Sequence, residues 1–397
     1  MKPLKISIRV SIPIQDGYLY AGNLFVVFKD GTLRTIPINN IIQKRFGSDD
    51  EKFNFFNLAF LRNNWFSNDQ SKSFFAIPNF EKALSKNWMQ NRDDAGIIID
   101  LSENDFSVLH ELPTLPIFDI RLFGMRLFVG NRDGLYDSGI SVDSNTGKVS
   151  SRDSLERVFD GRTTYLNSKT DTLLISSNSE GLFHGNLPEI NRRLHVGNNA
   201  IRPKSLRTGW SQHNVVNYES QSHFNLLSVE QEHLQERTYM YSSFDEDSKK
   251  IKITEIGHNS SDMFDALASH TNLIDNIRFA FNAPKSCYFL LNNGKFVNIF
   301  FNKYKENFRL SPRIKDVLQE DSNLLPKSKI ISANIIRDGC VLEYEDRVIL
   351  VQNGQETILE KFPVYSVRTY PTSIRYKNIV SIVDRYGISL YSVYPFK

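Results

Sequence analysis

One short pattern constrains the fold of this chain more than any other, and it recurs along most of the sequence. Its clearest copy is RLFVGNRDGLYDSGI, Arg126 to Ile140, in which two apolar runs flank Asp133 and Gly134. Asp-Gly between two apolar runs is a strong short signal for a β-hairpin, because glycine adopts the positive φ that a tight turn needs. The sequence therefore predicts a strand, a tight two-residue turn and a second strand.

Looser copies of this hairpin begin near residues 24, 126, 172, 288, 339 and 378. The shorter intervals between them indicate a repeating unit of about 40–50 residues, which is the size of one β-propeller blade. The two longest intervals are each expected to contain one further unit with a weaker pattern. The best matches are the strand-like SFFAIPN from Ser73 and the pair FNLLSVE and RTYMYSSF between Phe224 and Phe244.

In RDGLYDSG and SEGLFHG, an Asp-Gly or Glu-Gly turn after an apolar run is followed by Leu and an aromatic residue. This pattern resembles the turn of sensor-type β-propeller repeats. The Trp-Asp and Gly-His signatures of WD40 blades and the glycine pair of kelch blades are absent from the sequence. The resemblance implies an all-β propeller with seven blades, six and eight being the alternatives, in a single domain over residues 1–397. Alternating apolar residues from Ile6 to Ile14 predict a first strand, and propellers often close by pairing a terminal strand with the opposite end of the chain.

Two segments have helical rather than strand periodicity. Residues 79–91 place Phe80, Leu84 and Trp88 on one face, with Asn79 as the expected N-cap, and residues 261–276 show a similar pattern. Both are expected to be helical insertions in loops between blades. We interpret them as covers over apolar blade edges, with a docking surface as the alternative.

Charge and cysteine content exclude several classes of protein. The 48 Lys and Arg nearly balance the 45 Asp and Glu, so no global field attracts nucleic acid or an anionic membrane. No apolar run approaches the roughly 20 residues of a membrane helix. The two cysteines, Cys287 and Cys340, open equivalent hairpin arms and are expected to be small core residues in a reducing, cytoplasmic setting.

The sequence contains no recognisable catalytic motif. It has neither a phosphate-binding Gly-x-x-x-x-Gly-Lys loop nor a Gly-x-Gly-x-x-Gly turn. His110-Glu111 begins like a zinc-protease helix, but Pro113 would stop that helix and no second histidine follows at the right spacing. Ser211 lacks the glycine that closes a nucleophile elbow. We therefore expect no enzyme activity, no metal and no cofactor.

One local charge feature stands out, because no acidic residue occurs between Glu189 and Glu219. Arginines next to an aromatic residue suit nucleic acid, and they suit an acidic protein partner equally well. A solvated loop without a specific role is the third interpretation. The hypothesised binding residues of this basic segment are Arg192, Arg193, Arg202, Lys204, Arg207 and Trp210.

The function that the sequence favours is a non-catalytic interaction scaffold or recognition subunit in a cytoplasmic multiprotein complex. The alternatives are a nucleic-acid-binding subunit that uses residues 192–210, and a propeller enzyme with its site at the central channel.

If the scaffold prediction holds for the basic segment, partner capture should weaken without a lower melting temperature when its binding side chains are removed. A pull-down combined with thermal unfolding checks this, and unchanged capture would contradict it. The alanine set is Arg192, Arg193, Arg202, Arg207 and Trp210.

Overall fold

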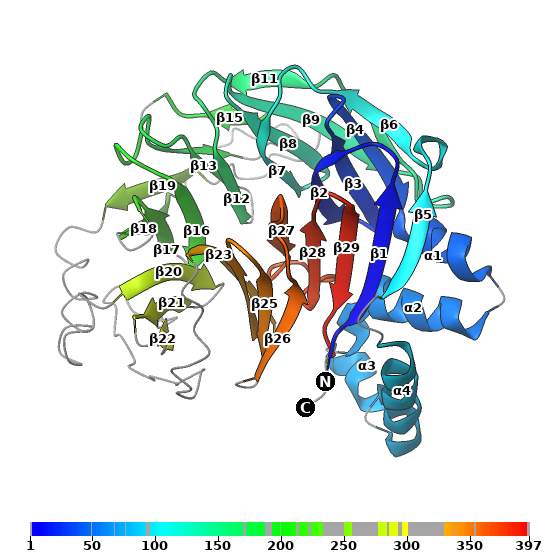
Figure 1. The fold of residues 1–397 in the computed structure, drawn as a ribbon. Helices are drawn as coiled ribbons and strands as arrows, with labels where there is room; N and C mark the ends of the chain where they lie inside the picture. The colour runs from blue at the N-terminus through cyan, green and yellow to red at the C-terminus, as the bar shows by residue number, and fades with distance from the viewer. Residues whose placement is uncertain are drawn as a thin grey trace, which may run out of the picture. The chain divides into compact units, whose positions relative to one another are not determined.

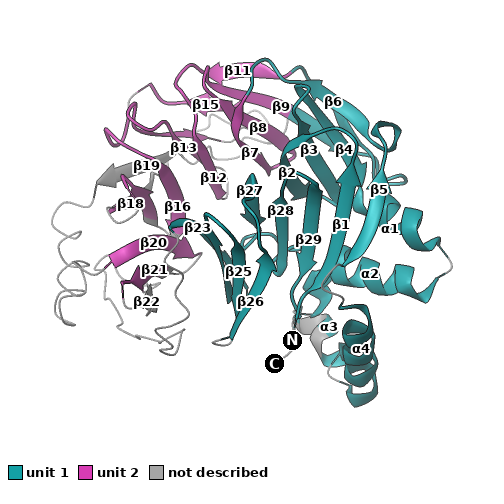
Figure 2. Ribbon diagram, viewed as in Figure 1, with its two compact units in different colours: residues 1–115, 139–154, 317–397 teal, residues 116–138, 155–316 magenta. Residues whose placement is uncertain are grey.

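The computed structural model describes the chain from Lys2 to Tyr394 with internal gaps, which are residues 49, 67, 76, 93–95, 170–171, 187–192, 199, 212–213, 221–223, 233–249, 256–276, 284–285, 293–295, 301–328, 338 and 353–354. The chain divides into two compact units (Figure 2). The first unit contains residues 1–115, 139–154 and 317–397, and the second contains residues 116–138 and 155–316.

The described strands form seven sheets (Figure 1), in which all neighbouring strands are antiparallel except for one parallel pair in the first unit. The first unit contains three complete sheets. The first consists of β2 (Ile14–Tyr20), β3 (Asn23–Phe28), β4 (Thr32–Pro37) and β6 (Ser107–Glu111), and the second of β23 (Ile330–Ile336), β24 (Gly339–Tyr344), β25 (Val348–Gln352) and β26 (Gln355–Glu360). The third consists of β27 (Ser366–Thr369), β28 (Ile379–Val383), β29 (Gly387–Ser392), β1 (Leu4–Val10) and β5 (Ile97–Leu101), and the unit also contains β10 (Val149–Ser151), which pairs with the second half of β9 (Leu135–Val142).

The second unit contains four sheets. The first consists of β7 (Ile117–Phe123), β8 (Arg126–Asn131), the first half of β9 and β11 (Glu156–Phe159), and the second of β12 (Tyr165–Lys169), β13 (Thr172–Ser176), β14 (Leu182–Asn186) and β15 (His195–Val196). The third consists of β16 (Arg207–Ser211), β17 (Asn214–Tyr218), β18 (Phe224–Glu232) and β19 (Lys250–Glu255), and the fourth of β20 (Ile277–Ala283), β21 (Ser286–Leu291) and β22 (Phe296–Phe300).

The repeated hairpin is confirmed as the second and third strands of a sheet. In the clearest copy, β8 and β9 flank three residues rather than the expected two. The side-chain oxygen of Asn131 accepts hydrogen bonds from the backbone N–H groups of Asp133 and Gly134, at 2.9 and 3.0 Å. Asp384 caps the turn between β28 and β29 in the same way. Asp133 is therefore a residue of the turn.

The glycine of this turn has a second reason to recur. Gly134 has a φ of 149°, and a Cβ placed on it would lie 2.1 Å from the carbonyl oxygen of Phe159. Gly387 repeats the arrangement against the carbonyl oxygen of Ile8. The fourth strand of the sheet thus passes too close for any side chain, so the glycine serves strand packing as well as the turn.

One of the two weaker predicted hairpins was placed wrongly. The segment from Ser73 does not form a strand, because it lies partly in the helix α3 (Asp69–Phe75). FNLLSVE is confirmed as a strand, β18, which pairs with β17 on one edge and β19 on the other. Its predicted partner RTYMYSSF lies outside the described residues, so that pairing stays a prediction.

Between β4 and β5 the chain leaves the sheets for a helical insertion of residues 38–91 (Figure 1). The predicted helix at 79–91 is confirmed as α4 (Pro78–Asn91), although its N-cap is Ile77 and not Asn79. The insertion also contains α1 (Ile38–Phe46), α2 (Glu51–Leu61) and the short η1 (Asn63–Phe66), which the sequence did not predict. The fold is therefore mostly β rather than all-β. The helix predicted at 261–276 lies outside the described residues.

Buried polar and aromatic contacts fix the helical insertion to the first unit. The Trp88 side chain is fully buried, donates a hydrogen bond to the backbone oxygen of Lys2 at 3.1 Å and packs edge-on against Tyr394. The Asn63 amide donates to the backbone oxygen of Ala59 and to the Ser392 hydroxyl. The helices consequently contact residues at both ends of the chain.

The N-terminal strand closes the last sheet of the first unit. β1 pairs in antiparallel fashion with β29, from Leu4 opposite Ser392 to Arg9 opposite Gly387. The predicted pairing of the first strand with the opposite end of the chain is confirmed, although that strand ends at Val10 and the next begins at Ile14. On its other edge β1 pairs in parallel with β5.

A buried ion pair reinforces this closure. The Lys5 ammonium lies 2.9 Å from the Glu360 carboxylate, and the Tyr391 hydroxyl donates to the same carboxylate oxygen at 2.6 Å. Burial is the main reason that the pKa of Tyr391 is raised, and the Glu360 carboxylate raises it further. Lys5 and Glu360 thus link the closing strand to β26.

Replacement of Glu360 by Ala should lower the free energy of unfolding by about 3–5 kcal/mol, because it leaves the Lys5 ammonium buried without its counter-charge. Denaturant unfolding measures this difference. In the double variant Lys5→Met/Glu360→Leu, most of the lost stability should return. Equal loss in the single and double variants would show that the charge pair is not the cause.

Candidate functional site

The basic segment predicted from the sequence lies in the second unit, where several of its cations already have protein partners. Arg193 forms an ion pair with Glu156 at 2.7 Å and donates to the backbone oxygen of Asp137 at 3.0 Å. Arg202 lies 3.7 Å from Glu219. These acids are distant in sequence or lie at the edge of the segment, which explains why the local charge count appeared unbalanced.

Arg207 is enclosed by aromatic rings. Its guanidinium lies 4.4 Å from the ring centroid of Tyr218 and 4.3 Å from that of Phe279, and it donates to the backbone oxygen of Ala280. Burial lowers the pKa of this guanidinium. The contacts join β16 to β17 and β20, so they account for Arg207 without a ligand.

Trp210 is also a packing residue. Its side chain is only 7% exposed and belongs to a core cluster with Leu174, Leu182 and Val215. The Lys169 ammonium lies 5.5 Å from the ring centroid, and burial lowers its pKa. Stacking of this indole on a nucleic-acid base would require the core to open.

The remaining members of the set differ from these. Lys204 is exposed, and Arg192 lies outside the described residues. The structure therefore does not bring the five described residues together on one exposed surface. A binding role for the set stays a prediction, but the expectation that its alanine variants keep the melting temperature does not fit Arg207 and Trp210, whose side chains pack within the fold. Of the described members, Lys204 is the one exposed to solvent.

A different surface collects apolar side chains. We define the aromatic ridge as Phe74, Ile77 and Phe80, which are 48%, 44% and 45% exposed. The Phe74 and Phe80 ring centroids lie 4.3 Å apart. Three large apolar side chains exposed next to one another at the α3–α4 junction are unusual, because each could lower the free energy further by leaving water.

The ridge arises from the way α4 divides its side chains. Leu84 and Trp88, spaced by four residues, form its buried face, and Phe75 of α3 is buried as well. Pro78 is the first residue of α4, and Ile77 precedes it as the N-cap, outside the helix. The buried face of α4 is occupied by Leu84 and Trp88, and the ridge side chains remain exposed.

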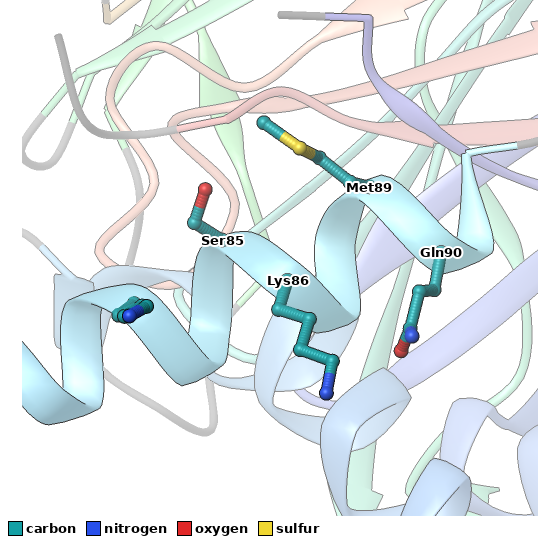
Figure 3. A pocket seen from close by; sticks show the side chains of 5 residues that line it. Ser85, Lys86, Met89 and Gln90 are labelled. Atoms are coloured by element: carbon teal, nitrogen blue, oxygen red, sulfur yellow. The ribbon is translucent and has the colours of Figure 1, made fainter.

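A shallow hollow of about 390 Å³ lies along the exposed side of α4. Figure 3 shows the side chains of Ser85, Lys86, Met89 and Gln90 around it. Lys82 completes the lining, so two ammonium groups and the Met89 thioether border the hollow without a carboxylate. The hollow offers an apolar strip with cations beside it and no pair of groups suited to acid–base chemistry.

Within the described residues, no three His, Cys, Asp or Glu side chains gather in a way that could hold a metal ion. Burial lowers the pKa of His110, with Asp153 opposing that shift. Both cysteines are confirmed as core residues: each is the second residue of the second strand of its sheet, and burial raises the pKa of Cys340 to about 12. Cys340 is thus held as an unreactive thiol.

The strand order identifies the fold class. Most of the sheets are short antiparallel meanders, and the N-terminal strand completes the sheet formed by the last three strands. This is the strand order of a β-propeller.

No protein-family model matches this chain, and no curated protein matches it in sequence. Several solved structures are similar at low identity. A computationally designed protein, Ika8, is 8% identical with a TM-score of 0.47, covering 99% of this chain and 100% of that chain. The WD40 repeats of RRP9 are 9% identical with a TM-score of 0.44, covering 99% of each chain. A chain of the mitotic checkpoint complex is 11% identical with a TM-score of 0.39, covering 73% of this chain and 80% of its own.

A membrane-crossing helix must be both long and apolar, and none of the helices in the described part of the chain meets that requirement.

The contacts of Arg207 within the basic segment lead to a prediction about stability. Replacement of Arg207 by Ala should lower the free energy of unfolding by about 2 kcal/mol, because it removes two cation–π contacts and a hydrogen bond to a buried carbonyl. Lys204→Ala, a matched change at an exposed cation nearby, should leave stability unchanged. Denaturant unfolding of both variants checks this, and equal stabilities would contradict the structural role of Arg207.

Proposed function

We propose that this chain is a non-catalytic interaction scaffold in a cytoplasmic multiprotein assembly, and that the aromatic ridge of the helical insertion is one of its docking surfaces. The observation that carries the proposal is the joint exposure of Phe74, Ile77 and Phe80 on an element held in place by buried contacts.

The rigidity of the insertion supports a docking role. Phe46 and Phe56 stack with their centroids 5.1 Å apart, Phe56 stacks on Phe60 at 6.0 Å, and Trp88 ties α4 to Lys2. A partner that binds a surface already fixed in one conformation loses little conformational entropy in ordering it. Aromatic side chains on such a surface are the residues that most often dominate a binding interface.

The surroundings of the ridge favour a protein partner. Two phenylalanines and an isoleucine offer dispersion and hydrophobic contacts but no hydrogen bonds to bases or phosphates. Lys82 and Lys86 border the hollow on the same helix and suit acidic residues at the rim of a partner interface. The nucleic-acid alternative loses support, because Arg207 and Trp210 are already engaged within the fold.

The proposal includes the architecture that presents these surfaces. We take each of the seven sheets as one blade, with the helical insertion placed after the third strand of the first complete meander, between β4 and β6. Repeat folds carry insertions in loops without disturbing the repeat, and loops on a rigid scaffold commonly supply binding residues.

Replacement of Phe74 and Phe80 by Asp should abolish capture of the protein partner, because the charges would have to be buried in the interface. The measurement is affinity purification of the full chain from its native host, with quantitative mass spectrometry of co-purifying proteins. The matched control is Phe362→Asp, an exposed phenylalanine between β26 and β27.

Both variants should keep the melting temperature of the original chain, since the altered side chains are about half exposed. Proteins that are captured equally by the original chain and by the Phe74→Asp/Phe80→Asp variant would overturn the docking role of the ridge.

A further inference from the structure

One connection between strands departs from an otherwise uniform pattern. In six of the seven sheets, the first and second strands are separated by two residues, as between Tyr20 and Asn23. In the last sheet, β27 ends at Thr369 and β28 begins at Ile379, so nine residues, Tyr370 to Asn378, join them. A two-residue link is enough to join two antiparallel strands, so pairing of β27 with β28 does not require the longer loop.

The nine-residue loop is built from buried contacts. The rings of Tyr370 and Tyr376 lie 5.8 Å apart and are 5% and 2% exposed. The Tyr376 hydroxyl accepts from the backbone N–H of Gly22 at 2.7 Å. The Tyr370 hydroxyl accepts from the backbone N–H of Leu19 at 3.0 Å, and burial raises the pKa of both phenols. The two uncharged tyrosines therefore anchor the loop to β2 and to the turn that follows it.

The backbone of the loop is fastened as well. The Ser373 hydroxyl accepts from the N–H groups of Arg375 and Tyr376, both at 3.2 Å. The backbone oxygen of Lys377 accepts from Arg337 at 2.9 Å. These bonds fix the tip of the loop before any partner arrives, which reduces the entropy lost on binding.

The tip presents Ile374, which at 76% is the most exposed large hydrophobic side chain that the structure describes. Arg375 and Lys377 follow it, and no acidic residue occurs among the nine loop residues. Neither cation pairs with a carboxylate within the described part of the chain. The loop thus holds an exposed aliphatic side chain next to two cations that have no carboxylate partner in the described part of the chain.

This combination points to a particular kind of ligand. Single-stranded nucleic acid would need an exposed aromatic face for base stacking, and both tyrosines of the loop are turned inward. A peptide with carboxylates and aliphatic side chains meets both features, because it can cover Ile374 and pair with the two cations.

We propose that the loop of residues 370–378 is a docking site for an acidic peptide segment of a partner protein, with Ile374 as the apolar anchor and Arg375 and Lys377 as the charge contacts. This site is separate from the aromatic ridge and does not depend on it.

The test uses a random peptide library displayed on phage, selected on the immobilised full chain and counter-selected on the Ile374→Asp variant. Enriched sequences should carry net negative charge and at least one aliphatic residue. A synthetic peptide of the enriched type should bind the original chain with an affinity that falls as salt rises. Ile374→Asp and Arg375→Glu should each weaken it about tenfold or more.

Two controls separate this result from other causes. Ile358→Asp changes an exposed isoleucine on β26 and should leave peptide affinity unchanged. Phe80→Asp should also leave it unchanged, so a failure of the ridge and a failure of the loop give different results. The melting temperature of Ile374→Asp should equal that of the original chain.

No enrichment over the Ile374→Asp variant would overturn the proposal, as would enriched peptides without acidic residues. Labelled single-stranded polyuridylate serves as a second probe. If it bound the original chain and lost affinity in Arg375→Glu, the loop would be a nucleic-acid site instead.

Discussion

The pairing of β1 with β29 is the interaction on which the first unit depends. It places residues from the two ends of the chain, Leu4 and Ser392, opposite each other in one sheet. The ion pair between Lys5 and Glu360 then joins this sheet to β26, and Trp88 binds the backbone of Lys2 just ahead of β1. The helical insertion is therefore held by a strand that also joins residues from both ends of the chain. A chain of this length gains its closing contacts late, because they join residues at the greatest sequence separation.

Some features of this fold repeat from sheet to sheet, and others occur once in the described chain. Bulges occur near the start of the first strand in four sheets, at Ile14/Asp16, Ile117/Asp119, Ile277/Phe279 and Ile330/Ser332. The glycines that follow the second strand repeat for a steric reason, because the fourth strand passes close to them. By contrast, the helical insertion and the loop between β27 and β28 each occur once in the described chain. Both carry exposed apolar side chains on rigidly fastened backbone, which is a costly arrangement unless a partner covers it.

The sequence could reveal the hairpins and the buried cysteines because those signals are local. Asp-Gly fixes a turn wherever it occurs, and an apolar residue at an equivalent repeat position meets the same layer of the core. It could not reveal α1 and α2 as readily, since α2 is apolar on several sides and lacks a clear helical stripe. The number of blades stays a prediction. The basic segment was harder still: Arg193 and Arg207 are neutralised or enclosed by Glu156, Tyr218 and Phe279, and such contacts are set by the tertiary fold. A count of charges along the chain contains no information on them.

The parallel pairing of β5 with β1 has a consequence for the order in which the chain can assemble during synthesis. β1 precedes β5 along the chain, and its antiparallel partner β29 is synthesised much later than either. Without a nearer partner, Ile6 and Ile8 would meanwhile remain on an unpaired strand with both edges open to other chains. β5 supplies Ile97 and Ile99 as neighbours of these two residues well before β29 is made. The helical insertion returns the chain to that position, so it gives β1 a partner long before β29 can.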